Sequence, residues 1–169
     1  YALRWYVTGH VPMGNGYETM LFMSLCALAA GCLLARRIQV VVPFAFLISG
    51  FTLLVAYIGQ MNPQITHLMP VLSSPLLSLH VSVIMLSYAL LAFCTLSAIA
   101  ALLVRGFNKD EARMSMAIEQ LTVLSRLMHY PALFLLAAGI FLGSVWAGIS
   151  WGSYWSWDPK EVWALITLL

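Results

Sequence analysis

The sequence predicts an all-α, polytopic membrane protein with four complete transmembrane helices and the start of a fifth. Hydrophobic residues make up 62% of the 169 residues and charged residues only 8%, whereas a soluble domain carries about 25% charged residues. A helix needs about 20 apolar residues to cross a bilayer core, and four stretches reach that length: 17–35, 38–59, 76–104 and 127–149. A soluble globular domain is therefore excluded.

Helix-capping residues mark the beginnings of two of these spans. Asn15 precedes the first span and stands three residues before Glu18, which is the spacing of an N-cap residue and its capping-box partner. Ser74 precedes Pro75 at the third span, and proline suits the first position of a helix. Both helices are expected to begin at these residues.

The fifth helix is expected to begin at residues 158–161, whose sequence Asp-Pro-Lys-Glu combines an N-cap, a proline and a capping-box glutamate. Its apolar part, from Trp163 to Leu169, would rise only about 10 Å and could not cross a bilayer. At the other end, Tyr1 opens within a polar segment that has no initiating Met and no signal peptide. We therefore expect the chain to be part of a longer protein, incomplete at both ends.

Positive charges predict the orientation of the spans, because Lys and Arg remain on the cytoplasmic side during insertion. Six of the eight Lys and Arg lie in predicted loops on one side: Arg36, Arg37, Arg105, Lys109, Arg113 and Arg126. Arg4 and Lys160 lie on the other side. We expect a bacterial inner-membrane protein whose periplasmic segments are 1–16, 60–75 and 150–162.

The segment 105–126, between the third and fourth spans, is predicted to be a cytoplasmic amphipathic loop. Its apolar residues are spaced for one helical face: Met114, Ile118, Leu121 and Leu124. A helix with one apolar and one charged face lies in the plane of the membrane interface. We expect this segment to lie along the cytoplasmic surface, in contact with lipid.

Charge and cysteine content exclude two kinds of partner. The net charge is +2 and no basic run is long enough to neutralise several phosphates, so nucleic acid is not expected as a partner. Three cysteines lie inside apolar stretches without CxxC spacing, which is typical of packed residues and not of a disulfide framework or a zinc site. They are Cys26, Cys32 and Cys94.

Tryptophans gather near the C-terminal end of the chain. Five of the six lie between residues 146 and 163, together with Tyr154 and next to Gly152. An aromatic belt at the membrane interface explains any single one of them, but a belt would place comparable residues at both interfaces. Concentration in one outward segment favours a platform for a large, flat, apolar ligand such as a porphyrin.

The run 151–161, with the sequence WGSYWSWDPKE, resembles the WWD signature of haem-handling membrane proteins. Its form is similar to that of the CcsA (ResC) family of the system II cytochrome c synthase. Three further blocks agree with this family: 4–18, 68–74 and 80–89. The related CcmC and CcmF types of system I lack the WDPKE continuation but remain an alternative.

The resemblance implies a single cytochrome c assembly domain over 1–169, with 150–163 as its WWD haem-binding segment. Such a protein, with a CcsB (ResB) partner, binds haem b at the outer face and joins it to the CxxCH thiols of apocytochrome c. Within the family pattern, His80 matches the outer iron ligand that precedes the signature, and the other histidines follow beyond Leu169. We therefore expect part of a haem lyase, inactive as this chain alone and holding haem weakly.

His80 is also a candidate from its position, because an ionisable side chain near the end of a membrane helix is a functional candidate and imidazole is a good haem ligand. The alternative is a histidine bonded to a helix carbonyl or a lipid headgroup. No residue of this chain is required as a nucleophile or an acid–base catalyst, because the thiols would come from apocytochrome c.

The other predicted haem-binding residues fall into three kinds. The aromatic platform supplies flat faces, with a glycine for close approach, and Asp158 caps the helix that positions it. The two outward cations are natural partners for haem propionates, and His10 belongs to a family-like block. These residues are Trp151, Gly152, Tyr154, Trp155, Trp157, Asp158, Lys160, Arg4 and His10.

Two other functions stay open at this point. A haem exporter or relay without ligase activity would need a haem path through the spans, whereas the strongest feature lies at the outer face. A structural subunit would use the same tryptophans to dock a partner protein, and a haem spectrum of the purified chain would distinguish it from both haem-binding functions.

Overall fold

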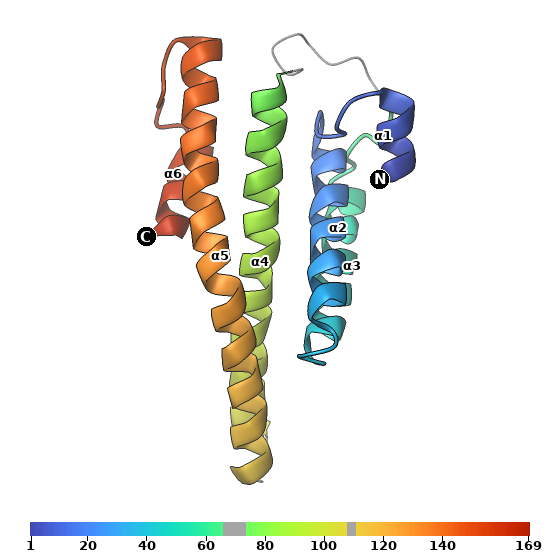
Figure 1. Ribbon diagram of the computed structural model, residues 1–169, viewed down its shortest axis with the longest axis vertical. Helices are drawn as coiled ribbons and strands as arrows, with labels where there is room; N and C mark the ends of the chain where they lie inside the picture. Colours follow the sequence, from blue (N-terminus) through green and yellow to red (C-terminus); the bar gives the residue numbers. More distant parts are fainter. Residues whose placement is uncertain (66–73, 108–110) are drawn as a thin grey trace.

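The computed structural model describes residues 1–65, 74–107 and 111–169, and these fold into helices joined by loops (Figure 1). The helices are α1 (Ala2–Thr8), α2 (Gly16–Leu34), α3 (Val41–Ile58), α4 (Pro75–Phe107), α5 (Glu111–Trp151) and α6 (Pro159–Leu168). Four of them, α2 to α5, are long and apolar enough to cross a membrane. The predicted all-α class and its four spans are confirmed. Lys109 and most of the 68–74 block lie outside the described residues.

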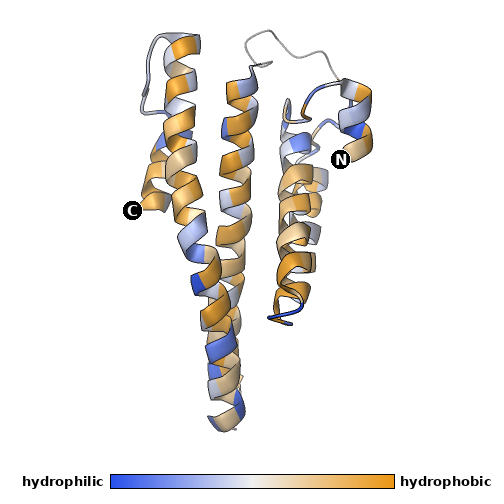
Figure 2. Ribbon diagram, in the orientation of Figure 1, coloured by the Kyte–Doolittle hydropathy of each residue, from blue (hydrophilic) through white to orange (hydrophobic). Residues whose placement is uncertain are grey.

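The long helices form two antiparallel pairs. α2 packs on α3 and α4 packs on α5, while α2 and α3 also contact α4, so the pairs lie side by side. α1 lies beside the upper end of α2, and α6 packs against α5 on the far side of the molecule (Figure 1). Figure 2 shows hydrophobic residues along the long helices and hydrophilic residues at the lower ends of α4 and α5.

Small residues allow the helices of the first pair to approach closely. A Cβ atom on Gly31 would lie 2.5 Å from Cβ of Ala45 on α3. Nearby, the hydroxyls of Ser24 and Ser49 share a hydrogen bond of 2.5 Å. Membrane helices associate through such small residues and interhelical hydrogen bonds, because lipid tails provide no hydrophobic driving force between helices.

The apolar core joins both helix pairs. Ala27 of α2 and Val41 of α3 are fully buried together with Phe93 of α4 and Leu124 of α5. These contacts fix where α4 and α5 lie relative to the shorter pair. α5 has 41 residues and α2 has 19, which makes them about 60 Å and about 29 Å long, so α5 extends well past the lower end of α2 (Figure 1).

The segment 105–126 differs from the prediction of a loop lying on the membrane surface. Residues 111–126 form the first part of α5, which continues as one helix to Trp151. No Gly or Pro interrupts residues 111–130, and Leu121 and Leu124 are buried in the protein. Its apolar face thus packs against the neighbouring helices, which is why no separate surface helix forms.

The predicted helix starts are confirmed where the structure describes the caps. The Asn15 side chain accepts a hydrogen bond from the Glu18 amide at 2.9 Å, and a complete capping box joins Asp158 and Glu161 at the start of α6. The carboxylate of Glu18, however, does not complete a box with Asn15. It accepts instead from the Gly14 amide at 2.7 Å and pairs with Arg4.

Substituting Gly31 by Ala should separate α2 from α3, because the new methyl group would overlap Cβ of Ala45. We expect the free energy of unfolding to fall by about 1–3 kcal/mol, the usual cost of overpacking. Unfolding of the purified protein in detergent, followed by circular dichroism, measures this. Gly50→Ala on α3, where a Cβ meets nothing within 4 Å, is the matched control; equal loss in both variants would contradict the packing argument.

Candidate functional site

A groove lies between α4, α5 and the segment that leads into α6. Its volume is about 980 Å³, and its walls include His80 and Tyr88 from α4, Gly143 and Trp146 from α5, and Trp155 from the connecting segment. We call it the aromatic groove. Trp151 and Trp155 of the predicted platform follow His80 by about 70 residues of sequence, yet they line the same cavity. The other platform residues, Gly152, Tyr154 and Trp157, are not among its lining residues.

The connecting segment, residues 151–157, is here called the Trp segment. α5 ends at Trp151, and Gly152 follows with a φ of 75°, a left-handed conformation that glycine adopts without steric cost. The chain then runs back along α5 toward α6 (Figure 1). The ring of Tyr154 rests where a side chain on Gly148 would be, because a Cβ there would lie 2.5 Å from its Cδ1 atom.

Two pairs of indole rings lie at the groove, and every member except Trp157 lines it. Trp146 and Trp151 meet edge to face with centroids 6.1 Å apart, and Trp155 and Trp157 do so at 5.8 Å. Trp151 is 67% and Trp157 71% exposed, so large aromatic faces stay uncovered by the described residues. The Nε1 atoms of Trp146 and Trp155 are buried without a hydrogen-bond partner among those residues.

Trp157 has a backbone φ of 59°, which is uncommon for a residue other than glycine and costs about 1–3 kcal/mol unless its surroundings impose it. The adjacent capping box is such a constraint. The Glu161 carboxylate accepts hydrogen bonds from the amides of Ser156 at 2.9 Å and Asp158 at 3.3 Å. The start of α6 therefore holds the end of the Trp segment in place.

His80 lies half-buried between α4 and α5. Its Nδ1 atom is 2.8 Å from the carbonyl oxygen of Gly139 on α5. A carbonyl only accepts hydrogen bonds, so Nδ1 carries the proton and Nε2 keeps its lone pair. The alternative reading of a histidine bonded to a helix carbonyl is thus correct for Nδ1, and it leaves Nε2 free to bind a metal.

The charged residues that line the groove differ in their roles: the two carboxylates cap α6, whereas the lysine is exposed. The Asp158 carboxylate accepts from the amides of Lys160 and Glu161 at 2.7 and 2.9 Å, as the predicted cap requires, and Glu161 serves the same cap. Lys160 is exposed and is the one Lys or Arg among the lining residues. An anionic group of a ligand in the groove would meet its ammonium group.

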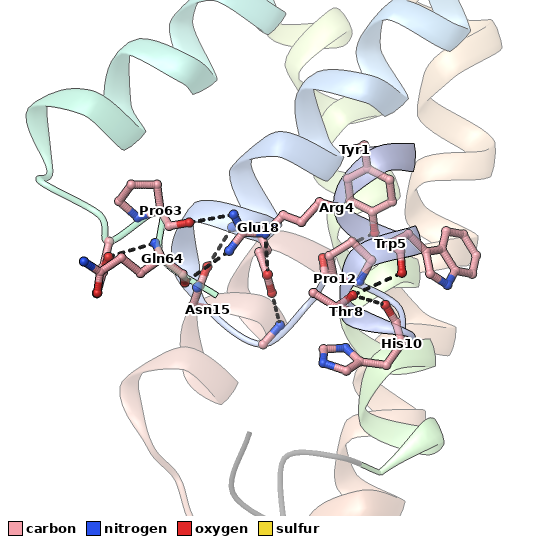
Figure 3. Close-up of polar contacts among 12 residues, drawn as sticks. Tyr1, Arg4, Trp5, Thr8, His10, Pro12, Asn15, Glu18, Pro63 and Gln64 are labelled. Atoms are coloured by element: carbon pink, nitrogen blue, oxygen red, sulfur yellow. Dashed lines mark hydrogen bonds and ion pairs between the residues drawn. The ribbon is translucent and has the colours of Figure 1, made fainter. Parts of the chain in front are cut away.

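The structure does not bring Arg4 and His10 to the aromatic groove. Both belong to the α1 region, beside α2 and across the molecule from α6 (Figure 1). The guanidinium of Arg4 pairs with Glu18 at 2.7 Å and donates to the carbonyl oxygens of Pro63 at 2.6 Å and Gln64 at 3.2 Å (Figure 3). These bonds tie α1 and the chain after α3 to the start of α2.

Tyr1 completes this polar cluster. Its hydroxyl donates to the carbonyl oxygen of Pro12 at 3.3 Å (Figure 3), and its ring packs on Phe22 with centroids 5.6 Å apart. Burial, together with the nearby Glu18 carboxylate, raises the pKa of Tyr1 to about 12. The hydroxyl therefore remains a donor at neutral pH. These contacts give the cluster a role in holding the helix ends together.

Sequence reasoning missed Gly143, which lies directly against His80. The spacing of Gly139 and Gly143, four residues apart in an apolar stretch, is the sequence signal of a close helix contact. Trp146 belongs to the predicted tryptophan cluster, but the burial of its nitrogen depends on the fold.

Two neighbouring residues of the 80–89 block differ in their surroundings. Tyr88 lines the groove, whereas Ser87 is buried and donates to the Ala132 carbonyl oxygen at 2.9 Å.

Fold and groove together define an integral, all-helical membrane protein with an aromatic groove at one end of its longest helix pair. Sequence comparison gives the family: the family described as "Cytochrome C assembly protein" matches residues 13–169. The chain belongs to this family.

Several curated relatives cover nearly the whole chain. Protein NrfI of Wolinella succinogenes is 38% identical over 99% of this chain, which corresponds to 19% of that protein. The cytochrome c biogenesis proteins CcsA of Mesostigma viride and Chlamydomonas reinhardtii are 32% and 33% identical over 98% and 99% of this chain. The chain spans 64% and 50% of those two proteins.

Gly148→Ala should release the Trp segment from α5, because a methyl group there would overlap the Tyr154 ring. An overlap that costs about 1–3 kcal/mol raises the fraction of molecules in which the Trp segment has left α5 about five-fold or more. Cleavage of the segment by chymotrypsin in detergent should speed up accordingly. Gly106→Ala on α4, where a Cβ meets nothing within 4 Å, should leave the rate unchanged; an unchanged rate in both variants would show that Tyr154 does not hold the segment.

Proposed function

We propose that the protein takes part in cytochrome c biogenesis by binding haem, as its substrate, in the aromatic groove and presenting it to apocytochrome c. The observation that carries this proposal is that His80 lines one cavity of about 980 Å³ together with four tryptophans, Trp146, Trp151, Trp155 and Trp163. Membership of the cytochrome C assembly family and the names of the CcsA relatives support the same function.

The residues of the groove fit the chemistry of haem. Flat indole faces suit a flat, apolar macrocycle, and the volume is at the upper end of the 300–1,000 Å³ typical of ligand pockets. The Nε2 atom of His80 is a suitable axial ligand for iron. Lys160 can pair with a propionate, and the unpartnered indole N–H groups of Trp146 and Trp155 are donors that a bound ligand could satisfy.

The reaction of the whole protein would be the addition of CxxCH thiols to the vinyl groups of haem. Haem supplies the reactive groups when bound, and the substrate protein supplies the thiols. The groove residues then contribute binding and orientation, which bring the reactants together without a nucleophile from this chain. Among the described residues a single histidine lines the groove, so a second axial ligand would come from elsewhere. A CcsB (ResB) partner would take part in the complete reaction.

The charge distribution supports a periplasmic location for the groove in a bacterial inner membrane. Arg36 and Arg37 lie at the turn between α2 and α3, at the opposite end of the bundle from the Trp segment. Positive charges stay on the cytoplasmic side. We therefore propose that the Trp segment, as the WWD segment of the family, faces the compartment in which cytochromes c receive haem.

His80→Gly tests the proposal directly. Removing the imidazole should abolish the visible spectrum of histidine-bound haem, because the groove loses its iron ligand. Added imidazole should restore part of the spectrum by occupying the vacated space. The measurement is a haem titration followed by absorption, with protein level in the membrane as the control. An unchanged spectrum in His80→Gly would show that His80 is not the ligand.

Alanine at Trp155, which lines the groove, or at Trp157, which packs against Trp155, tests the platform. Loss of one aromatic contact of about 0.5–1.5 kcal/mol should lower haem affinity about two- to ten-fold with little change in protein level. Trp5→Ala is the comparison, because Trp5 lies on α1, away from the groove. Equal effects of all three substitutions, or lost membrane insertion in place of lost haem, would favour an interfacial belt.

A further inference from the structure

We propose that Gly143 positions His80 for iron binding by leaving the Gly139 carbonyl open to the imidazole ring. The inference rests on the proposed function, since it describes how the iron ligand of that site is oriented. It assigns a role to a residue that has no functional group of its own.

The contact between the ring and the glycine is close. A Cβ atom placed on Gly143 would lie 2.5 Å from Cε1, 2.8 Å from Nδ1 and 3.2 Å from Nε2 of His80. The distances to Cε1 and Nδ1 are too short for non-bonded atoms, because carbon–carbon contacts lie near 3.5–4.0 Å, and the distance to Nε2 is tight. The imidazole therefore occupies the space that any other residue at position 143 would fill with its side chain.

Helix geometry explains why position 143 controls access to the carbonyl of residue 139. Side chains on an α-helix tilt toward the N-terminus and cover the preceding turn. A side chain on residue 143 would thus lie over the carbonyl oxygen of residue 139, which accepts the amide hydrogen of residue 143 within the helix. With glycine at 143, the second lone pair of that oxygen is exposed to α4. His80 uses it through a hydrogen bond of 2.8 Å.

This hydrogen bond sets which ring nitrogen can bind iron. Because the carbonyl accepts the Nδ1 proton, the lone pair resides on Nε2. A metal-binding histidine commonly donates its other N–H to such an acceptor, which fixes the tautomer and raises the basicity of the ligand. His80 is a lining residue of the aromatic groove, so its orientation is set before any ligand arrives.

A glycine contact away from the groove provides the comparison. A Cβ on Gly31 of α2 would lie 2.5 Å from Cβ of Ala45 on α3, as close as a Cβ on Gly143 would lie to Cε1 of His80. Gly31→Ala therefore crowds a helix contact to a similar degree without touching His80. Gly139 does not serve for this comparison, because its carbonyl oxygen binds His80.

The first experiment uses the ligand-free protein. Nitrogen NMR of the protein labelled with ¹⁵N-histidine, in detergent or lipid, reports the tautomer of each of the four histidines, and His80→Gly assigns the relevant signals. We expect the Nδ1–H tautomer for His80 and its loss in Gly143→Ala. Gly31→Ala, which crowds the α2–α3 contact instead, should retain it. An Nε2–H tautomer in the unsubstituted protein, or an unchanged tautomer in Gly143→Ala, would overturn the inference.

The second experiment measures haem binding in the same variants. Loss of an outer partner of a metal ligand costs about 10–100-fold in affinity, so we expect a fall of that size in Gly143→Ala and less than a two-fold change in Gly31→Ala. A fall of the same size in both variants would overturn the inference, because it would indicate general loss of helix packing.

A double variant separates positioning from folding. In His80→Gly/Gly143→Ala the ring is absent, so the new methyl group has room and the protein should be as stable as His80→Gly alone. The methyl group now narrows the vacated space, and imidazole should restore haem binding at about ten-fold higher concentration than in His80→Gly. An equal imidazole requirement in His80→Gly and in the double variant would show that Gly143 does not shape the space that the ring occupies.

Failure of the proposed function gives a different pattern. If His80→Gly bound haem with full affinity, His80 would not be the iron ligand and Gly143 could not position one. The NMR result would then still report the hydrogen bond, and it would identify the contact as structural.

Discussion

The close antiparallel contact between α4 and α5 is the feature on which the rest of this structure depends. It brings His80 against α5 and creates the wall from which the aromatic groove is built. In a membrane, such a contact gains little from the exclusion of water, so it requires tight packing and satisfied polar groups. Gly139 and Gly143 allow the tight packing, and the His80–Gly139 hydrogen bond satisfies two polar groups. One arrangement thus stabilises the helix pair and orients its most reactive side chain.

The Trp segment adds to this pair a wall that is held by local interactions. Gly152 reverses the chain, Tyr154 rests on Gly148, and the capping box at Asp158 fixes the far end. None of these contacts needs the exposed indole faces, which therefore remain available. At the other side of the molecule, the polar cluster around Arg4 and Glu18 also fixes segments through polar contacts: it joins α1, α2 and the chain after α3.

Sequence patterns predicted those parts of the structure that depend on short-range physics. The spans follow from apolar length, and the caps at Asn15 and Asp158 follow from residue type and spacing. The partners of Arg4 could not be found in this way, because the carbonyl oxygens of Pro63 and Gln64 lie about 60 residues away. The conformation of residues 111–126 likewise depends on α2 and α3, because Leu124 packs in the core that these helices share with α5. Gly143 carries no chemistry of its own, so only its neighbour His80 reveals its importance.

The His80 ring and Gly143 are in close contact although they are 63 residues apart in sequence. A Cβ atom at position 143 would lie 2.5 Å from Cε1 of the ring, so the residue types at the two positions depend on each other. The geometry leaves room for a larger residue at position 143 where position 80 is small, and for histidine at position 80 where position 143 is glycine. Evolutionary change at either position is therefore conditional on the other. A drift from glycine to alanine, ordinarily a mild substitution in a helix, would here require the loss or relocation of the imidazole.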